Sequence, residues 1–465
     1  MLSTRHAAAR TKPLSRAFSS SIPRGRERLV ILGSGWGGYT LLQGIDKRRW
    51  DVVVLSPTAY FNFTPLLAGC AVGTLEYRCA LEPVRKYSPR VTAYQAWCDK
   101  IDFKRRRLQC MPATPAIWKH SATEHVDPHL GLQTIENAPF TLRYDKLVIA
   151  AGAYSQTFNV PGVKENAHFL KDIRDARKIH MRIIECFEQA NQPTLSDIER
   201  RNLLNFCIVG GGPTGVEFSA ELHDFLHSDL ARHYPALARL AKINLYDVAP
   251  QILSNFDLNL VQYTEKTFRR EGISIWTNHH VTSVEAGKMF VEEQGEVPFG
   301  MLVWSTGLAP NPLIDDIQDV KKYKKLALLT DDRLNIIHTD GTVNDAVWAI
   351  GDCSVIDGAP LPATAQVANQ KGKYLVKALN GIARDQPISK PFEFRSLGNL
   401  AYVGNWKAIY DRPGAEGFLS RESGRLAWLL WRSAYFTRTL SIRNRILLPF
   451  YWFFNWIFGR DLSRF

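Results

Sequence analysis

Short apolar runs that end in glycine-rich or small-residue turns recur along this chain. Residues 28–32 (RLVIL) and 205–209 (NFCIV) are apolar runs of strand length, and each leads into a glycine-rich loop. Similar runs end in small residues at 144–153, 299–307 and 346–352. A strand of a parallel sheet reads as a continuous apolar run because both faces of the sheet are covered. The pattern predicts an α/β fold with two doubly wound, Rossmann-like domains, the last strand returning to the first domain.

The two glycine-rich loops share the spacing G-x-G-x-x-G. Their glycines are Gly33, Gly35 and Gly38 in the first loop and Gly210, Gly212 and Gly215 in the second. The first glycine of this pattern makes a tight turn, the second lets backbone N–H groups approach a pyrophosphate, and the third brings helix and strand together. One such loop also fits an ordinary turn. Two of them, each between a strand and a helix, predict two dinucleotides that exchange electrons.

Composition and charge change this picture at the ends of the chain. The 465 residues are 45% hydrophobic, and the formal net charge is +13. Residues 1–27 carry basic side chains among Ala and Ser with no acid before Glu27, which is typical of a mitochondrial transit peptide; a basic tail is the alternative. Since no nucleic-acid-binding motif is present, we expect the remaining basic charge to favour anionic lipid. Seven cysteines without a C-x-x-C pair indicate neither a redox dithiol nor a zinc site.

Taken in order, these motifs resemble the two-dinucleotide-binding-domain flavoproteins. More narrowly, Ser56-Pro57, 60–67 (YFNFTPLL), 210–217 (GGGPTGVE), 364–368 (TAQVA) and the aromatic C-terminal segment are similar to the fungal mitochondrial type II, rotenone-insensitive NADH:ubiquinone oxidoreductases. The resemblance runs from about residue 28 to Phe465. It implies a respiratory-chain flavoprotein that passes a hydride from NADH to FAD, reduces ubiquinone, and does not pump protons.

The resemblance also implies a domain organisation. The expected parts are a transit peptide (1–27), a first part of the FAD-binding domain (28–200), an NADH-binding domain (201–328), a second part of the FAD-binding domain (329–395) and a membrane-association and dimerisation region (396–465).

In that family the first loop holds FAD, bound non-covalently. The further positions that the resemblance assigns to FAD are Ser56, Thr64, Pro65, Gly152, Asp352 and Ala365. Ser56 stands where the general dinucleotide rule expects an acid, but the fungal members also carry Ser-Pro there. The alternative interpretation of Asp352 is that it caps the N-terminus of a helix, and this role is compatible with FAD binding. The aromatic run before Thr64 fits core packing equally well.

The second loop is assigned to NADH on independent grounds. The apolar strand 243–246 ends at Asp247, where a carboxylate can accept both ribose hydroxyls. A 2′-phosphate would be repelled there, and no arginine follows in 248–251. The pattern therefore predicts NADH over NADPH, with a strand-end turn residue as the alternative interpretation of Asp247. Gly307, in the turn after the strand that ends at Trp304, completes the expected NADH site.

Two residues are expected to act near the reacting rings. Glu217 follows the last glycine of the second loop; it either orients the nicotinamide or is a carboxylate stabilised by the first turn of the helix. The resemblance favours the first role. Gln366 resembles the family's quinone contact on the opposite face of the flavin. Relatives often carry histidine at the quinone-site position of Asn369, and asparagine cannot titrate, so quinol protons must come from water or another group.

The C-terminal segment predicts attachment to a membrane surface. No apolar run reaches the roughly 18 residues that a spanning helix needs. At about 100° per residue, Trp428, Trp431, Tyr435 and Ile442 fall on one stripe that arginines flank, which is typical of a helix in the headgroup layer. A core helix is the alternative, and the aromatic block 450–458 favours lipid. We expect a peripheral protein of the mitochondrial inner membrane, with the matrix side favoured, that forms a homodimer.

Two other functions compete with this interpretation. A sulfide:quinone oxidoreductase needs a cysteine pair beside the flavin, for which Cys186 and Cys353 are the candidates, but it leaves the second loop and Asp247 unexplained. An apoptosis-inducing-factor-like NADH-binding flavoprotein leaves Gln366 and the aromatic C-terminal segment unexplained. Ubiquinone-dependent turnover separates the three functions.

Overall fold

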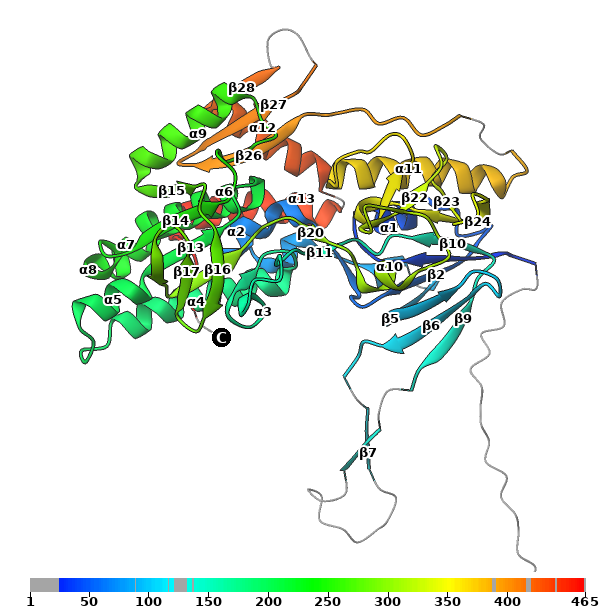
Figure 1. The fold of residues 1–465 in the computed structure, drawn as a ribbon, viewed down its shortest axis with the longest axis horizontal. Coiled ribbons are helices and arrows are strands. Elements are labelled where there is room, and N and C mark those ends of the chain that lie inside the picture. The colour runs from blue at the N-terminus through cyan, green and yellow to red at the C-terminus, as the bar shows by residue number, and fades with distance from the viewer. Residues whose placement is uncertain are drawn as a thin grey trace, which may run out of the picture.

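The computed structural model describes residues 25–87, 89–115, 117–120, 132–135, 138–386, 390–414, 420–439 and 441–463. Residues 1–24, which hold most of the expected transit peptide, lie outside the described residues. Two α/β domains lie side by side, and a C-terminal unit packs across them (Figure 1). The α/β fold of two doubly wound domains is thereby confirmed.

The first domain is built on a large mixed sheet. Its strands are, in order, β21 (Lys322–Tyr323), β22 (Ala327–Thr330), β23 (Asn335–Ile337), β24 (Val343–Ala349), β10 (Lys146–Ile149), β1 (Arg28–Leu32), β2 (Asp51–Ser56), β5 (Val91–Asp102), β6 (Arg107–Pro112) and β9 (Phe140–Arg143), with β25 (Ser354–Ile356) beside β22. The central strands β24, β10, β1, β2 and β5 are parallel. The chain therefore returns to this sheet through β24 after it has formed the second domain.

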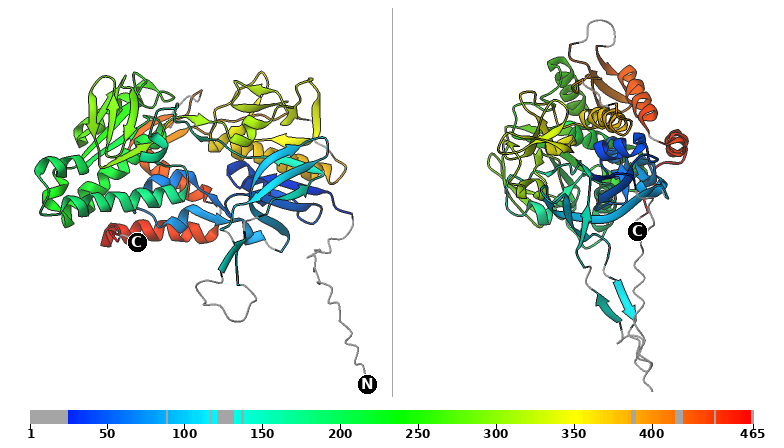
Figure 2. Two further views of the ribbon diagram at one scale, coloured as in Figure 1. Left: turned by 60° about the horizontal axis from the view of Figure 1, so that its bottom comes forward. Right: turned by 90° about the vertical axis from the view of Figure 1, so that its right-hand side faces the viewer.

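Helices α1 (Trp36–Gly44) and α11 (Ala365–Ile382) pack against each other in the first domain. Helix α11 begins at the cap residue Thr364, whose hydroxyl accepts from the N–H of Val367. Such a cap satisfies one of the free N–H groups at the helix start. A hairpin of β7 (Ile117–His120) and β8 (Leu132–Ile135) projects from this domain (Figure 2). Smaller elements are β3 (Tyr60–Asn62), η1 (Thr64–Leu66), α2 (Leu67–Ala71), η2 (Tyr77–Ala80), β4 (Leu81–Pro83), η3 (Val84–Tyr87), α10 (Pro312–Asp316) and η5 (Gly351–Cys353).

The second domain repeats the parallel pattern on a smaller scale. Its sheet has the order β12 (His168–Phe169), β19 (Met301–Trp304), β13 (Asn205–Val209), β14 (Lys242–Asp247) and β15 (Ile273–Thr277). An antiparallel sheet follows, with β16 (Val281–Glu285), β17 (Lys288–Val291) and β18 (Gly295–Pro298). Two antiparallel segments, β11 (Tyr154–Ser155) and β20 (Leu308–Ala309), pair where the chain passes between the domains (Figure 1).

The helices of the second domain bring the functional residues together. They are α3 (Val163–Asn166), α4 (Ile173–Ala190), α5 (Asp197–Leu203), α6 (Pro213–Phe225), the π-helical turn η4 (Leu226–Leu230), α7 (Ala231–His233), α8 (Pro235–Ala238) and α9 (Leu258–Glu271). Helix α6 begins with proline in its first turn, where the missing N–H costs nothing. It continues into η4, α7 and α8, which separate the second loop from β14.

The C-terminal unit consists of a small sheet and two helices. These are β26 (Asn399–Gly404), β27 (Lys407–Asp411), β28 (Arg421–Gly424), α12 (Arg425–Arg438) and α13 (Ile442–Phe458). Strand β26 packs on α6, and α13 contacts η2 of the first domain. Helix α13, red in Figure 2, runs along the outside of the molecule. Among the described residues, no helix has the length and apolar character that a membrane crossing requires.

The predicted lipid-facing stripe on α12 is wrong. Trp431 and Tyr435 are only 7% and 9% exposed, because the Trp431 indole bonds to Glu217 on α6 and the Tyr435 ring packs edge-on against Phe63. The aromatic face of α12 thus belongs to the protein interior, which is the alternative interpretation. Ile442 of the predicted stripe, which lies on α13, is 76% exposed. On the two C-terminal helices the exposed apolar side chains lie mostly on α13: they are Leu426, Leu429, Phe436, Ile442, Ile446, Phe450, Phe453, Phe454, Trp456, Ile457 and Phe458.

Candidate active site

Both glycine-rich loops have the shape that their spacing predicts. Gly33 and Gly210 adopt φ values of +109° and +113°, which favour glycine, and a Cβ on Gly33 would collide with the Ala150 carbonyl. A Cβ on Gly35 or Gly212 would instead meet nothing within 4 Å. The middle glycine of each loop therefore borders open space at the start of a helix. The first turns of α1 and α6 contain no acidic residue, so their positive ends favour an anion.

The third glycines make the close approach of helix and strand possible. A Cβ on Gly38 would collide with the carbonyl oxygen of Gly33, and a Cβ on Gly215 would collide with that of Gly210. Any larger residue at either position would push the helix away from its loop. The two loops are thus equivalent in backbone shape, and the side chains beside them distinguish the two sites.

Asp247 and Ser56 occupy corresponding places beside the two loops. Asp247 ends β14, where its carboxylate accepts from the N–H of Gly211 at 2.5 Å and from that of Ala249 at 2.8 Å. Ser56 ends β2 and is buried, with its hydroxyl 2.9 Å from that of Ser34 in the first loop. A carboxylate therefore lies at the second loop and a neutral hydroxyl pair at the first.

A buried charged cluster lies behind the first loop. Asp352, in η5, lies near Lys171 and Lys371, and burial raises the pKa of its carboxyl. Burial also lowers the pKa of Lys171, and it lowers that of Lys371 to about 8. Lys371 donates to the Ser354 carbonyl and hydroxyl, whereas the buried Lys171 ammonium has no hydrogen-bond partner among the described residues. An unpaired buried ammonium fits a bound group that supplies oxygen acceptors.

Other predicted FAD positions surround this cluster. Gly152 has a φ of +67°, and a Cβ there would meet nothing within 4 Å. The Thr64 hydroxyl accepts from the Trp36 indole at 3.0 Å, which ties η1 to the start of α1. Asp352 is the middle residue of the short 3₁₀ turn η5, whose N-cap is Ile350, so Asp352 does not cap this turn. Together, the open glycines, the unpaired Lys171 and Asp352 form a site that fits a flavin dinucleotide.

A cavity of about 720 Å³ lies between α6 and the C-terminal unit. Its aromatic wall comprises Trp406, Trp428, Trp431, Trp452 and Trp456. Its acidic wall comprises Glu217, Glu221, Asp224 and Asp229, which follow one another along α6 and η4, together with Glu271 of α9. His223, Arg432 and Arg460 line the cavity as well. Pro65 and Leu66, next to the predicted flavin wall, also line it. The cavity can therefore hold a flat apolar group against aromatic rings, with acidic side chains opposite.

Glu217 is held by the C-terminal unit. Its Oε1 atom accepts from the backbone N–H of Tyr402 and from the indole N–H of Trp431, both at 3.1 Å. Burial raises the pKa of Glu217 to about 7, although these two hydrogen bonds act in the opposite direction. Glu217 lies beyond the first turn of α6, so the interpretation as a carboxylate stabilised by that turn is wrong.

The arrangement described so far matches known proteins. Residues 27–372 match the pyridine nucleotide-disulphide oxidoreductase family, and residues 397–461 match the NDH2 C-terminal domain. An internal alternative NAD(P)H-ubiquinone oxidoreductase A1 of Solanum tuberosum mitochondria is 36% identical, over 94% of this chain and 88% of the relative. An external alternative NADH-ubiquinone oxidoreductase of Yarrowia lipolytica mitochondria is 35% identical, over 94% and 81%. The chain belongs to the alternative, type II NADH-ubiquinone oxidoreductase family.

A solved structure supports this assignment. NDH2 from Plasmodium falciparum in complex with NADH is 25% identical and superposes with a TM-score of 0.83, covering 94% of this chain and all of that one. The sulfide:quinone oxidoreductase of Aquifex aeolicus shares the fold, with a TM-score of 0.64 at 15% identity. In this chain Cys186 donates to the Gly300 carbonyl and Cys353 to the Ile149 carbonyl, in different domains. The two cysteines therefore do not form the pair that the sulfide enzyme needs.

The residues that the family resemblance assigned to the quinone lie outside the cavity. Gln366 donates to the Gly398 carbonyl at 2.9 Å and accepts from the N–H of Leu397 at 2.8 Å, so it fixes the segment that leads into β26. Asn369 donates to the Thr40 hydroxyl at 2.8 Å and thereby joins α11 to α1. Neither side chain is part of the cavity lining, and their quinone contact stays a prediction. The same holds for Ala365, at the first position of α11, as an FAD contact.

Several functional residues were not found by sequence reasoning. Lys171, Tyr402 and Arg432 reach the site from segments far from either loop. The Arg432 guanidinium lies 4.4 Å from the Trp428 ring centre and 4.2 Å from that of Trp452. A lysine, tyrosine or arginine in an ordinary sequence context carries no signal for such long-range contacts.

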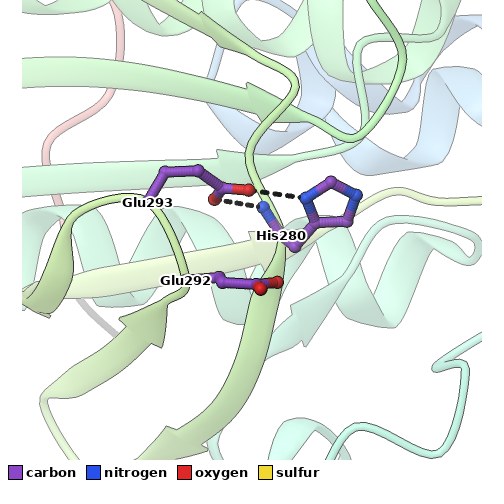
Figure 3. Close-up of side chains that lie close together, drawn as sticks. All are labelled: His280, Glu292 and Glu293. Atoms are coloured by element: carbon purple, nitrogen blue, oxygen red, sulfur yellow. Dashed lines mark hydrogen bonds and ion pairs between the residues drawn. The ribbon is translucent and has the colours of Figure 1, made fainter.

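A surface group of metal-ligand type lies in the second domain, away from the cavity. In the part of the chain that the structure describes, ligand atoms of His280, Glu292 and Glu293 lie within 4.8 Å of one another (Figure 3). All three residues are exposed, and both carboxylate oxygens of Glu293 already accept from His280, through its ring and its backbone N–H. The hydrogen bond to His280 lowers the pKa of Glu293 to about 2. The group is accounted for as an exposed ion pair.

Proposed function

We propose how this chain carries out the activity of its family, the transfer of two electrons from NADH through FAD to ubiquinone without proton pumping. In this proposal the second domain binds NADH, the first binds FAD, and the cavity between α6 and the C-terminal unit receives ubiquinone. The bound flavin supplies the redox centre that takes a hydride from NADH and passes two electrons to the quinone. The proposal depends on one observation: helix α6 begins at the second nucleotide loop, packs against α2 of the first domain and lines the aromatic cavity.

Asp247 selects the nucleotide in this proposal. Its carboxylate lies beside Gly211 of the second loop, which is where a ribose follows a pyrophosphate bound at the N-terminus of α6. A negative charge there attracts ribose hydroxyls and repels a 2′-phosphate. NADH is therefore the preferred donor. Gly212 and Gly307 leave room for the nucleotide, since a Cβ on Gly212 meets nothing within 4 Å and one on Gly307 touches only the Phe158 ring at 4.0 Å.

Lys171, Asp352 and the first loop hold FAD in this proposal. Lys171 supplies the unpaired donor and Asp352 the acceptor for the polar chain of the cofactor, while Gly35 and Gly152 give its backbone close access. Thr64 and Pro65 lie against the flavin in this proposal, and Pro65 also lines the cavity. The hydroxyl pair of Ser34 and Ser56 replaces the carboxylate of the second site, so the first site carries less negative charge toward the FAD ribose.

Ubiquinone enters the cavity from the side of the C-terminal helices. The aromatic wall supplies stacking surfaces for a quinone ring, and Glu217 lies where a polar group can meet its oxygens. Because the pKa of Glu217 is raised to about 7, this carboxyl changes its charge near neutral pH. Trp431 lines the cavity and holds Glu217 in place, because its indole N–H donates to the Glu217 carboxylate.

The exposed face of α13 attaches the enzyme to the membrane surface. Ile446, Phe450 and Phe453 are 65%, 54% and 60% exposed, and the chain carries exposed arginines at positions 443 and 445. An apolar helical face with basic side chains is typical of helices that lie in the headgroup layer. The mouth of the cavity, which includes Trp452 and Trp456 of α13, then opens toward the source of ubiquinone. The relatives are mitochondrial, and we propose the inner membrane, on its matrix side.

Turnover of the purified, FAD-loaded protein tests this function. We expect NADH oxidation that depends on ubiquinone-1, a molar flavin content near that of the protein, and a preference for NADH over NADPH. Absence of quinone-dependent oxidation in a protein that holds FAD would contradict the proposal. The homodimer stays a prediction, and light scattering of the same sample measures it.

A further inference from the structure

Quinol formation needs a proton that the nucleotide does not supply. The overall reaction is NADH + H⁺ + quinone → NAD⁺ + quinol, so the hydride provides one hydrogen and water provides the other. The need for this second proton rests on the proposed function. Asn369 cannot titrate and bonds to Thr40 outside the cavity. The proton therefore has to enter the cavity along another group.

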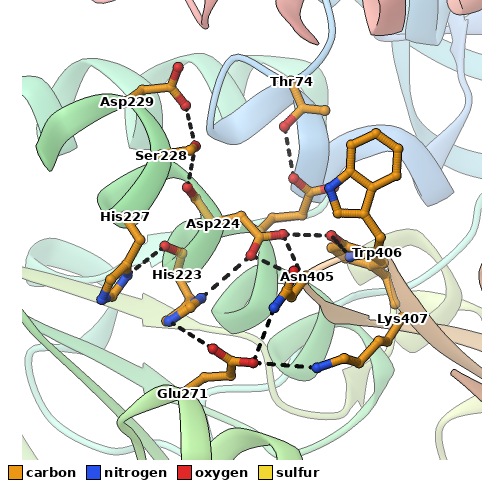
Figure 4. Close-up of polar contacts among 12 residues, drawn as sticks. Thr74, His223, Asp224, His227, Ser228, Asp229, Glu271, Asn405, Trp406 and Lys407 are labelled. Atoms are coloured by element: carbon orange, nitrogen blue, oxygen red, sulfur yellow. Dashed lines mark hydrogen bonds and ion pairs between the residues drawn. The ribbon is translucent and has the colours of Figure 1, made fainter. Parts of the chain in front are cut away.

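His223 lies between two carboxylates in the wall of the cavity. Its Nδ1 atom lies 3.4 Å from Oδ1 of Asp224, and its Nε2 atom lies 3.8 Å from Oε2 of Glu271 (Figure 4). The His223 side chain is only 8% exposed, whereas that of Glu271 is 24% exposed and lies beside the Lys407 ammonium at 3.4 Å. Each ring nitrogen thus faces a carboxylate, and the Glu271 side chain is the more exposed of the two, at 24% against 16% for Asp224.

Asp224 accepts further hydrogen bonds in the cavity wall. Its Oδ2 atom accepts from the Tyr402 hydroxyl at 2.5 Å, and both of its oxygens accept from the N–H of Asn405. Tyr402 and Asp224 both line the cavity, together with Glu217 and Glu221. The backbone N–H of the same Tyr402 binds Glu217. One ion-pair contact and the hydrogen bonds therefore run along the cavity wall from Glu271 through His223 and Asp224 to Tyr402.

An imidazole between two carboxylates is suited to pass a proton. It can accept a proton on one nitrogen and release one from the other, with a carboxylate on each side. The neighbouring His227 is different, although its ring stacks on His223 at 4.0 Å between centres. Its Nδ1 bonds to the His223 carbonyl, and the residue is exposed. His227 does not connect two carboxylates.

We propose that Glu271, His223 and Asp224 form the proton inlet of the quinone cavity. A proton from water binds at Glu271, crosses His223 to Asp224, and reaches the quinone through the Tyr402 hydroxyl and cavity water. One proton enters for each quinol formed, which balances the reaction above. In this proposal His223 passes the proton to Asp224 and is not itself the donor to the quinone.

The test compares acceptors that do and do not take up a proton. Ubiquinone-1 takes a proton from water with each hydride equivalent, whereas ferricyanide takes electrons alone. In His223→Gln we expect ubiquinone-1 turnover to fall about tenfold or more, within the range of general acid–base effects. Ferricyanide turnover and anaerobic flavin reduction by NADH should stay at the wild-type rate. His233→Gln, at an exposed histidine of α7 outside the cavity lining, should leave all three rates unchanged.

Two further readouts separate proton transfer from structural damage. The solvent deuterium isotope effect on ubiquinone-1 turnover should rise in His223→Gln. In His223→Ala, which leaves space for a small base, added imidazole should restore part of the turnover. If a His223 variant loses its flavin, Asp224→Asn, which keeps an acceptor for Tyr402, is measured in the same way.

Each result of these experiments either supports or contradicts the proton inlet. Equal losses with both acceptors, an unchanged ubiquinone-1 rate, or the same effect in His233→Gln would overturn the proton inlet. A wild-type protein that holds FAD but does not use ubiquinone-1 would instead overturn the proposed function. Loss confined to ubiquinone-1, with an increased isotope effect and imidazole rescue, is the result expected for the inlet.

Discussion

Replacing Asp247 with serine should weaken the preference of the enzyme for NADH. The carboxylate accepts from the N–H groups of Gly211 and Ala249 and is the one acidic side chain that the structure places against the second loop among the described residues. Serine is compatible with this place in the fold, because Ser56 occupies the corresponding position beside the first loop. The substitution therefore removes the charge without an obvious steric conflict.

The size of the effect follows from the hydrogen bonds that are lost. A hydrogen bond to a charged group contributes about 1.5–3 kcal/mol, which corresponds to roughly a 10- to 150-fold decrease in kcat/KM for NADH. Removal of the charge also ends the repulsion of a 2′-phosphate, so kcat/KM for NADPH should stay constant or rise. Steady-state rates with each nucleotide and ferricyanide measure both values without involving the quinone cavity.

A matched control is Asp257→Ser, in the same domain. Asp257 caps α9 by accepting from the N–H of Asn259, and serine can still cap a helix. It should leave the ratio of the two kcat/KM values unchanged. If Asp247→Ser keeps the wild-type ratio while it binds FAD normally, Asp247 does not contact the ribose, and the strand-end turn interpretation is correct.

Three further predictions concern the rest of the site. In Gln366→Ala, loss of the bonds to Leu397 and Gly398 should slow flavin reoxidation by ubiquinone-1 and leave reduction by NADH intact. Stopped-flow absorbance measures both steps, and slowed reduction with normal reoxidation would refute the predicted role of Gln366 in the quinone reaction. Replacing Ile446, Phe450 and Phe453 with serine should reduce co-sedimentation with anionic vesicles, since each buried large apolar side chain contributes about 1.5–3 kcal/mol; Leu308→Ser, exposed on another surface, is the control, and undiminished binding would place the membrane contact elsewhere. Because the pKa of Glu217 is raised from 4.5 to about 7, the folded state holds this proton more tightly than the unfolded state, so stability should fall as pH rises through that interval, by up to about 3 kcal/mol. Melting temperatures of wild type and Glu217→Gln between pH 5 and 8 check this, and parallel curves would contradict it.

Local sequence patterns were sufficient to predict the two domains and both loops. The requirement for glycine at Gly33 and Gly210 comes from a backbone conformation that the loop itself imposes, so the spacing alone reveals it. Asp247 was found in the same way, because it ends a strand at a fixed place beside the second loop. The return of the chain to the first sheet through β24 was also visible, as an apolar run ending in small residues.

The contacts between distant segments could not be predicted. Lys171 reaches Asp352, and Trp431 reaches Glu217, across more than a hundred positions of the chain. Periodicity placed Trp431 and Tyr435 on one face of α12 correctly, but it cannot tell whether such a face meets lipid or protein. In this protein the Trp431 indole donates to Glu217 and the Tyr435 ring packs against Phe63, so this face of α12 lies in the protein interior.

The central claim is that ubiquinone binds in the cavity between α6 and the C-terminal unit. Single-turnover reoxidation of a cavity variant tests it most directly. Gly69 lines the cavity, and a Cβ there would lie 3.5 Å from Oε1 of Glu221. Gly69→Leu should therefore fill part of the cavity without changing either nucleotide loop. Each protein is reduced anaerobically with one equivalent of NADH and then mixed with ubiquinone-1 while flavin absorbance is followed. The account predicts normal reduction and markedly slower reoxidation in Gly69→Leu; reoxidation at the wild-type rate would show that the quinone does not use this cavity.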